Sequence, residues 1–164
     1  MPEASRLNVK LADLNLAEEA TALVALMEEY ARDPMGGGQG LSDSVKAQLP
    51  AALKARPQAF TLIAWLDGKA IGLVNCFEGF STFKCQPLIN IHDVIVSQAY
   101  RGQGIAQRLL QAVEALAREK GCCKLTLEVL QGNARAQKTY TAFGFSDYQL
   151  DPAAGSALFW EKPL

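Results

Sequence analysis

Apolar and polar residues follow two different periods in the first part of the chain. Residues 7–11 alternate apolar with polar, a period of two that predicts a half-buried strand. Apolar residues then recur at helical spacing over residues 16–30, which predicts a helix. This helix is expected to end at Asp33-Pro34, because proline and the glycines at 36–38 interrupt regular structure.

The middle of the chain predicts one helix followed by three strands. Ser42 or Asp43 is placed to cap the helix. A turn at Asp67-Gly68 separates two runs of strand composition, which indicates a hairpin. The expected elements are a helix through about Arg56 and strands at 59–66, 70–77 and 88–96.

The most regular helical pattern follows the strand at 88–96. Ile105, Leu109, Val113 and Leu116 stand at i, i+4, i+8 and i+11 with polar residues opposite, and Gly121 suits the C-terminal cap. The remaining expected elements are a strand at 124–130, a helix at 133–142 and two closing strands at 145–150 and 156–162.

Length and composition favour one globular domain over residues 1–164. The chain is 49% hydrophobic and 20% charged, so it can bury a sizeable core and is not disordered. Its formal net charge of −1 lacks the basic excess of a general nucleic-acid binder. We therefore expect no nucleic-acid partner.

Targeting and metal-binding signals are not found in the sequence. Residues 1–10 have no apolar signal-peptide core, and no stretch has the length of a membrane span. The four cysteines, at 76, 85, 122 and 123, form no C-x-x-C pair, so zinc ligation together with His92 is disfavoured. We expect a cytoplasmic protein with reduced thiols, no metal and no membrane contact.

A glycine turn between a strand and a helix suggests an anion site. Val94-Ile95-Val96 ends the strand, and Arg101-Gly102-Gln103-Gly104-Ile105-Ala106 leads into the helix, whose first N–H groups are unpaired and electropositive. Arg101 could add a cation. The alternatives are a glycine-eased helix entry and a dinucleotide fingerprint with Glu128 as the ribose-binding acid. Gln107, in place of the third glycine, argues against the fingerprint.

The motif Arg101-x-x-Gly104-x-Ala106 after an apolar strand resembles the acetyl-CoA signature of the GNAT acetyltransferases. Asn133, Ala136, Tyr140 and the segment Phe143-Gly144-Phe145 resemble the next helix and strand of that family. The order of expected elements agrees over nearly the whole chain. The resemblance implies an α+β, three-layer (α/β) fold, in which a mixed, splayed central sheet carries helices on both faces.

The resemblance also implies how acetyl-CoA would bind. The pantetheine arm would lie like an added strand along the strand at 94–96, with the pyrophosphate on the helix N-terminus. Asn133 would hold the pantetheine from its other side. The cofactor-binding residues expected on this basis are Val94, Ile95, Val96, Arg101, Gly102, Gln103, Gly104, Ile105, Ala106, Asn133 and Ala136.

Tyr140 and His92 are the candidate catalytic residues. On spacing alone Tyr140 is a core aromatic, whereas the resemblance implies that it protonates the departing CoA thiolate. Strand alternation places the side chains of His92 and Asp93 on opposite faces of the sheet. A lone histidine in a strand is commonly structural. The strand at 88–96 is also similar to polyamine and thialysine acetyltransferases, where a glutamate occupies the position of His92. A neutral imidazole can replace that carboxylate as the base, and Asp93 is interpreted as structural, satisfied by backbone N–H groups or a cation.

The expected activity is transfer of an acetyl group from acetyl-CoA to a primary amine of a small molecule, such as a polyamine or amino-acid-like compound, by direct attack in a ternary complex. A protein or peptide amine, or a non-catalytic acyl-CoA sensor, is the alternative. Glu28, Glu29 and Asp33 could attract a cationic acceptor or form a solvated helix face. The resemblance also suggests a homodimer.

Overall fold

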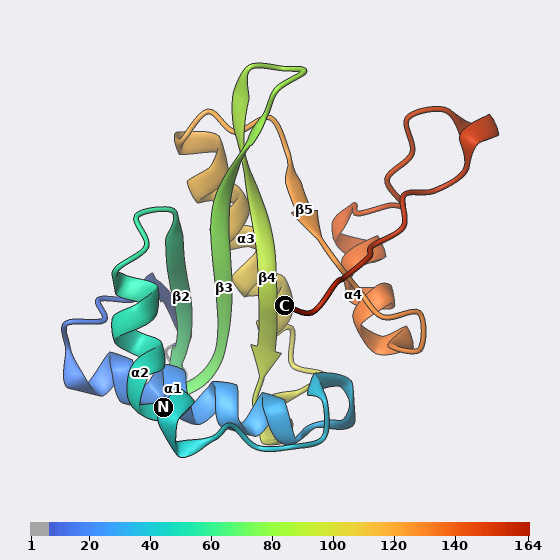
Figure 1. Cartoon of the computed structure of the whole chain (residues 1–164). Coiled ribbons are helices and arrows are strands. Elements are labelled where there is room, and N and C mark those ends of the chain that lie inside the picture. Colours follow the sequence, from blue (N-terminus) through green and yellow to red (C-terminus); the bar gives the residue numbers. More distant parts are fainter. Residues whose placement is uncertain (1–6) are drawn as a thin grey trace, which may run out of the picture. The chain divides into compact units, whose positions relative to one another are not determined.

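The computed structural model describes residues 7–164 and contains one five-stranded sheet (Figure 1). The strands follow the spatial order β1-β2-β3-β4-β5; the first four pair antiparallel, and β5 pairs parallel with β4. They are Leu7–Leu11 (β1), Ala59–Leu66 (β2), Lys69–Ser81 (β3), Gln86–Val96 (β4) and Leu125–Leu127 (β5). The sheet is therefore mixed, as expected.

Within the described residues, four α-helices and three short 3-10 helices accompany the strands. The α-helices are Ala17–Arg32 (α1), Asp43–Lys54 (α2), Ile105–Glu119 (α3) and Ala134–Phe143 (α4), and the 3-10 helices are Pro34–Gly36 (η1), Gln98–Tyr100 (η2) and Pro152–Ala154 (η3). Ser42 caps α2 by accepting a hydrogen bond from the N–H of Val45, as predicted. Each predicted helix is present to within a few residues.

The chain divides into two compact units, one extending to Leu130 and the other comprising Gln131–Leu164. The first unit holds all five strands with α1, α2 and α3, and the second holds α4 and η3. The single domain over residues 1–164 stays a prediction.

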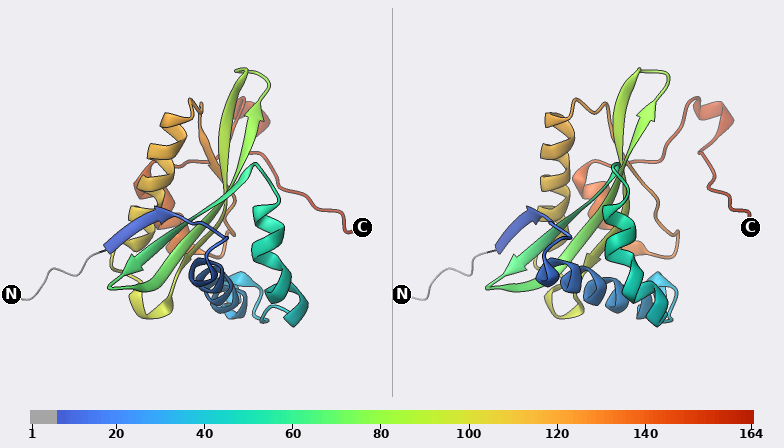
Figure 2. Two further views of the ribbon diagram at one scale, coloured as in Figure 1. Left: turned by 90° about the vertical axis from the view of Figure 1, so that its left-hand side faces the viewer. Right: turned by 60° about the vertical axis from the view of Figure 1, so that its left-hand side comes forward.

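In the first unit, helices cover both faces of the sheet (Figure 2). On one face, Leu23 and Leu26 of α1 pack in a buried cluster with Leu73 and Ile95. On the other, Gly72 of β3 lies against α3: a Cβ there would be 3.3 Å from side-chain atoms of Ile105 and Leu109. The absence of a side chain at this position lets α3 approach the sheet closely.

Several predicted strands differ from those observed. β3 and β4 extend beyond the strands predicted at 70–77 and 88–96 and meet at an exposed tip around Phe83, while β5 is shorter than residues 124–130. The closing strands predicted at 145–150 and 156–162 are wrong. One backbone hydrogen bond, from Ala157 N to Tyr148 O at 3.0 Å, joins these segments around η3. Their apolar pattern suits a strand, but a strand also requires a ladder of backbone partners.

Membrane and targeting predictions are tested in part. No helix within residues 7–164 has both the length and the apolar character needed to cross a membrane. The first six residues, which belong to the segment examined for a signal peptide, lie outside the described residues. The cytoplasmic location stays a prediction.

Candidate active site

β4 has an unpaired edge over its last residues. Its parallel pairing with β5 covers Ile89–Ile91 against Leu125–Leu127. Beyond this point, Val94–Val96 pairs with β3 on one side, and no strand among the described residues pairs with it on the other. The sheet therefore parts between β4 and β5. Backbone groups on this edge of β4, other than the Val96 carbonyl that accepts from Arg101 Nε, can bind an extended amide-bearing ligand.

A β-bulge at His92 lies where the two strands part. Asn75 of β3 pairs with Asp93, whereas the next residue, Cys76, pairs with Ile91. His92 is therefore the extra residue that β3 leaves unpaired. A bulge bends its strand and redirects side chains, and bulges are frequent beside active sites.

The bulge places His92 and Asp93 on the same face of the sheet, so the predicted alternation is wrong here. The His92 ring packs edge-on against Phe77, with 5.3 Å between ring centroids, and Asp93 Oδ2 accepts a hydrogen bond from Asn75 Nδ2 at 3.0 Å. Asn75 and Phe77 are two residues apart in β3 and share one face. The extra residue shifts the in-out alternation of side chains by one position after the bulge. The sequence pattern alone does not reveal a bulge.

Asp93 ends a buried chain of polar side chains on the α1 face. Thr61 Oγ1 donates to Asn75 Oδ1 at 2.6 Å, and Asn75 Nδ2 donates to Asp93 and to Met27 Sδ at 3.3 Å. Thr61 and Asn75 are each 3% exposed. The Asp93 carboxylate is thus held by a side-chain amide instead of the predicted backbone N–H groups or cation. Burial, followed by the negative charge of Asp93, raises the pKa of Tyr30.

The glycine turn before α3 has the geometry expected of an anion site. Gly102 and Gly104 have φ angles of 76° and 77°, a left-handed conformation that glycine adopts without strain. No side chain among residues 7–164 caps the N-terminus of α3, and the first turn of this helix carries no acidic residue. Its first N–H groups therefore remain available, and their partial positive charge suits a pyrophosphate.

The Arg101 guanidinium makes two contacts within the protein. Its Nη2 donates to Asp33 Oδ2 at 3.0 Å, and its Nε donates to the carbonyl of Val96 at 3.1 Å. The guanidinium thus links the end of α1 to the end of β4. A carboxylate and a carbonyl thus engage the guanidinium, and a role for Arg101 beside the phosphates stays a prediction.

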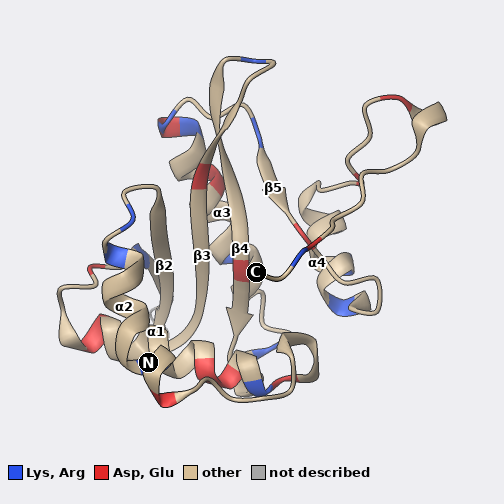
Figure 3. Ribbon diagram, viewed as in Figure 1, with Lys and Arg blue, Asp and Glu red and all other residues tan. Residues whose placement is uncertain are grey.

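The acidic residues at the end of α1 form contacts within the protein. Charged residues of both signs are found in this part of the ribbon (Figure 3). Glu28 accepts from Arg32 and from the N–H of Leu41, and Glu29 accepts from the N–H of Gln98 at 2.7 Å. A backbone hydrogen bond to Leu41 is the main cause that lowers the pKa of Glu28. These contacts support a structural role instead of capture of a cationic acceptor.

Comparison with known proteins agrees with this geometry. Residues 23–145 match the family described as "Acetyltransferase (GNAT) family". The chain belongs to the GNAT acetyltransferase family. The fold shows the family's features in its mixed, parted sheet and in the glycine turn after β4.

The named relatives match this chain over only part of their own length. A thialysine N-epsilon-acetyltransferase of Bos taurus is 41% identical over 77 residues, or 47% of this chain and 45% of the relative. An aminoglycoside N(6')-acetyltransferase type 1 of Salmonella typhimurium is 27% identical over 90 residues, or 53% of this chain and 62% of the relative. The matched segments thus span about half the length of these curated relatives.

A solved structure of similar fold covers nearly all of the chain. An aminoglycoside N-acetyltransferase in complex with CoA superimposes with a TM-score of 0.75 at 20% identity, covering 100% of this chain and 99% of its own. At this identity the likeness shows the fold. The GNAT fold predicted from the sequence is confirmed.

The other predicted GNAT site residues lie in the second unit. Asn133 Oδ1 accepts from the N–H of Ala136 at 3.1 Å and so caps α4, while Gly144 ends the helix with a φ of 113°. The Tyr140 ring packs edge-on against Phe145 with 6.0 Å between centroids. The Asn133 carbonyl is engaged by the cap, but its NH2 group is a separate donor. Roles for Asn133, Ala136 and Tyr140 in this GNAT site stay predictions.

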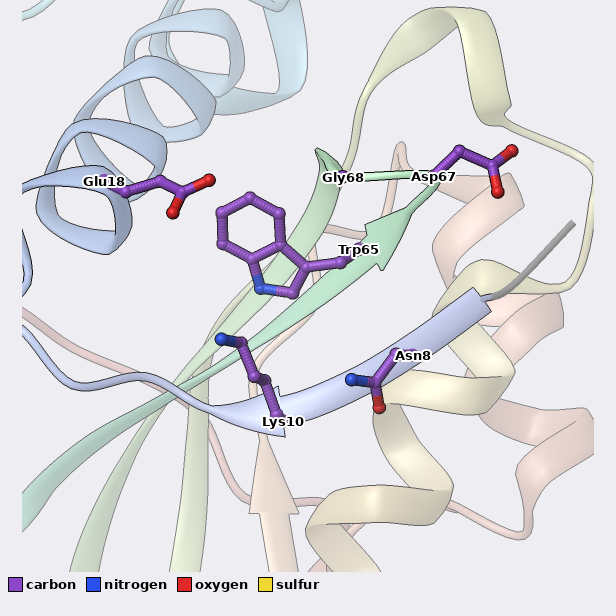
Figure 4. A pocket seen from close by; sticks show the side chains of 6 residues that line it. All are labelled: Asn8, Lys10, Glu18, Trp65, Asp67 and Gly68. Carbon is purple, nitrogen blue, oxygen red and sulfur yellow. The ribbon is translucent and has the colours of Figure 1, made fainter.

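A hollow outside the predicted GNAT site lies between β1, α1 and the end of β2 (Figure 4). Its floor is the ring of Trp65, with Lys10 Nζ at 5.4 Å from the ring centroid. Its lining is Asn8, Lys10, Glu18, Trp65, Asp67 and Gly68. None of the predicted site residues lines it.

Within residues 7–164 of this GNAT chain, no group of three His, Cys, Asp or Glu side chains is placed to hold a metal ion. All four cysteines are free.

The sequence pattern did not identify the polar chain in which Thr61 bonds to Asn75 and Asn75 bonds to Asp93. A signal was present, because each is a polar residue inside an otherwise apolar strand run. Buried polar side chains are generally hydrogen-bonded, so such pairs predict a network. Their pairing across two strands required the register that the structure supplies.

Proposed function

We propose that this chain is an acetyl-CoA-dependent N-acetyltransferase that acetylates a primary amine of a small molecule by direct attack in a ternary complex. The observation that carries the proposal is the unpaired edge of β4 at Val94–Val96, adjoining the uncapped N-terminus of α3. A strand edge suits the pantetheine amides, and the helix terminus suits the pyrophosphate. Membership of the GNAT family supports the same assignment.

The catalytic roles follow from the chemistry of the transfer. The amine nitrogen attacks the thioester carbon, and the carbon–sulfur bond breaks. His92, exposed on the bulge, accepts the proton that the amine loses. A backbone N–H near Val94 polarises the thioester carbonyl, and Tyr140 gives a proton to the CoA thiolate. Asp93, on the same face as His92, adds negative charge that attracts a cationic amine.

Small-molecule amines are the proposed acceptors because the names of two relatives give such substrates, thialysine and aminoglycosides. The test measures release of CoA thiol from acetyl-CoA with polyamines, lysine-like amino acids, aminoglycosides and peptides bearing free amines. We expect turnover with at least one small-molecule amine. Turnover with peptides alone would favour a protein acceptor. Binding of acetyl-CoA with no turnover on any amine would favour an acyl-CoA sensor.

Tyr140→Phe tests the proposed general acid. The variant should keep acetyl-CoA affinity and lower kcat by about 100-fold, the usual contribution of a positioned acid. Tyr148→Phe removes another tyrosine hydroxyl of the second unit and is the matched control. If the kcat of Tyr140→Phe is within threefold of wild type, Tyr140 is a packing residue and not the general acid.

A further inference from the structure

The connection between β4 and α3 is attached to the end of α1 at two points. Glu29 Oε1 accepts from the N–H of Gln98 at 2.7 Å, at the start of η2. Asp33 Oδ2 accepts from Arg101 Nη2 at 3.0 Å, immediately before Gly102. Both contacts bridge almost seventy residues of sequence, so they form through the tertiary fold.

Asp33 is itself rigidly held, which makes it a firm attachment point. Its N–H donates to the carbonyl of Tyr30, its carbonyl accepts from Gly36 and Gly38, and its Oδ1 accepts from the N–H of Met35 at 2.9 Å. The side chains of Asp33 and Arg101 are 21% and 30% exposed. A charged pair that is partly shielded from water holds its geometry better than an exposed one.

The turn beyond Arg101 needs such an attachment. Gly102 and Gly104 both have positive φ angles, and a Cβ at either would meet no atom within 4 Å. Glycines in open space lose much conformational entropy when they are fixed in one conformation. Arg101 limits this freedom by bonding to the Val96 carbonyl and to Asp33 together.

We propose that Asp33 is a positioning residue for acyl-CoA binding, which acts through Arg101 to hold the β4–α3 connection in the conformation that presents the N-terminus of α3 to the pyrophosphate. Arg101 is then a link between α1 and β4, and the phosphates bind the backbone N–H groups. This inference rests on the proposed function, which assigns the turn to acyl-CoA. It couples the end of α1 to cofactor affinity.

The charge change in Asp33→Asn separates this proposal from a phosphate-binding role for Arg101. If Arg101 bound phosphate, removing its competing carboxylate would leave CoA affinity unchanged or increase it, because a negative charge near the phosphates is also lost. If Asp33 positions the turn, CoA affinity falls although the repulsion is removed. The positioning role thus predicts weaker CoA binding, and the phosphate-binding role predicts unchanged or tighter CoA binding.

The experiment measures the Kd for CoA by calorimetry and steady-state kinetics with acetyl-CoA and S-acetylpantetheine. We expect Asp33→Asn and Arg101→Lys each to weaken CoA binding about tenfold, because lysine cannot make both contacts of the guanidinium. The double variant should bind no more weakly than either single variant, since both remove one interaction. Glu114→Gln, which breaks the Glu114–Arg118 pair on α3, makes the same charge change and should bind as wild type.

S-acetylpantetheine distinguishes positioning from general damage to the fold. It lacks the pyrophosphate, so its kcat/KM should be unchanged by Asp33→Asn, whereas a variant with a disturbed fold would lose activity with both donors. Equal losses with both donors, or Asp33→Asn affinity equal to or above wild type, would overturn the inference alone. A wild-type chain that binds no CoA would overturn the proposed function as well.

Discussion

On the α3 face of the central sheet the buried side chains are apolar, whereas on the α1 face Thr61, Asn75 and Asp93 form a polar chain among apolar neighbours. The two faces share the same strands, so the difference lies in the side chains and not in the backbone. The α3 face is closed by Leu109 and its neighbours against Gly72. It has the composition of a packing surface.

The polar chain requires a different explanation, because burying such groups is costly unless every partner is satisfied. It ends at Asp93, beside the bulge that turns His92 to the same face. We interpret the α3 face as a packing surface and the α1 face as the acceptor side of the proposed active site. This division predicts that the largest single loss of stability comes from the α3 face and the loss of catalysis from the α1 face.

Leu109→Ala should have the largest effect on stability. Leu109 is 0% exposed and lies against Gly72, so the variant loses buried apolar surface and leaves a cavity. We expect the free energy of unfolding to fall by about 3 to 5 kcal/mol, measured by urea denaturation. Gln111→Ala, on the exposed side of α3, is the control and should change it by less than about 0.5 kcal/mol. A loss below about 1 kcal/mol for Leu109→Ala would contradict the packing role of this face.

His92→Ala should affect catalysis and leave stability nearly unchanged. The side chain is exposed on the bulge, and loss of a general base lowers kcat by about 100-fold, equivalent to about 2.7 kcal/mol. The rate is measured at saturating acetyl-CoA with a series of amines, so that titration of the acceptor is separated from that of the enzyme. Asp93→Asn is the comparison. If it lowers kcat while His92→Ala does not, the base is Asp93.

Asn75→Ala should lower stability through lost hydrogen bonds. The variant leaves the Thr61 hydroxyl and the Asp93 carboxylate without the partner they share. We expect the free energy of unfolding to fall by about 2 kcal/mol, and by about 1 kcal/mol in Thr61→Val, where one hydrogen bond is lost. Chemical denaturation measures both. Equal stability of Asn75→Ala and wild type would show that the polar chain contributes nothing to the fold.

The sequence predicted the elements whose signal is local. The helical spacing of Ile105, Leu109 and Val113 and the cap at Ser42 correspond to observed α3 and α2. The glycine turn was recognisable because positive φ angles favour glycine. The two closing strands were predicted from composition alone and do not form, since pairing depends on distant backbone.

The arrangement of the site depends on non-local contacts, which the sequence pattern does not carry. One extra residue at His92 reverses the alternation that a regular strand would have and brings His92 and Asp93 together. The bond between Arg101 and Asp33 joins residues 68 positions apart. The bulge depends on the strand register, and the Arg101–Asp33 bond depends on the packing of α1. The sequence therefore predicted candidate residues of the site but not the partners that they contact.

A further expected effect, smaller than that of Asn75→Ala, is a change in the pH dependence of stability from Cys76 on the α3 face. Burial, followed by the charge of Asp93, raises the pKa of the Cys76 thiol from its ordinary value of 9.0 to about 12. The folded state therefore keeps the proton at pH values where the unfolded chain loses it. This contribution to stability is complete below about pH 9 and is lost as the pH rises toward 12. At pH 10 the loss is about 1.4 kcal/mol.

Cys76→Ala should remove this part of the alkaline loss. Unfolding free energies of wild type and variant are compared at pH 8 and pH 10. Between these pH values, the wild type should lose about 1.4 kcal/mol more stability than the variant. Other groups that titrate in this range are common to both proteins and cancel in the comparison. Tyr30→Phe tests the opposite face: burial raises the pKa of Tyr30, so its contribution is lost only above its ordinary value of 10.0. If Cys76→Ala and wild type lose equal stability between pH 8 and pH 10, the thiol is not shielded from water as the α3 face requires.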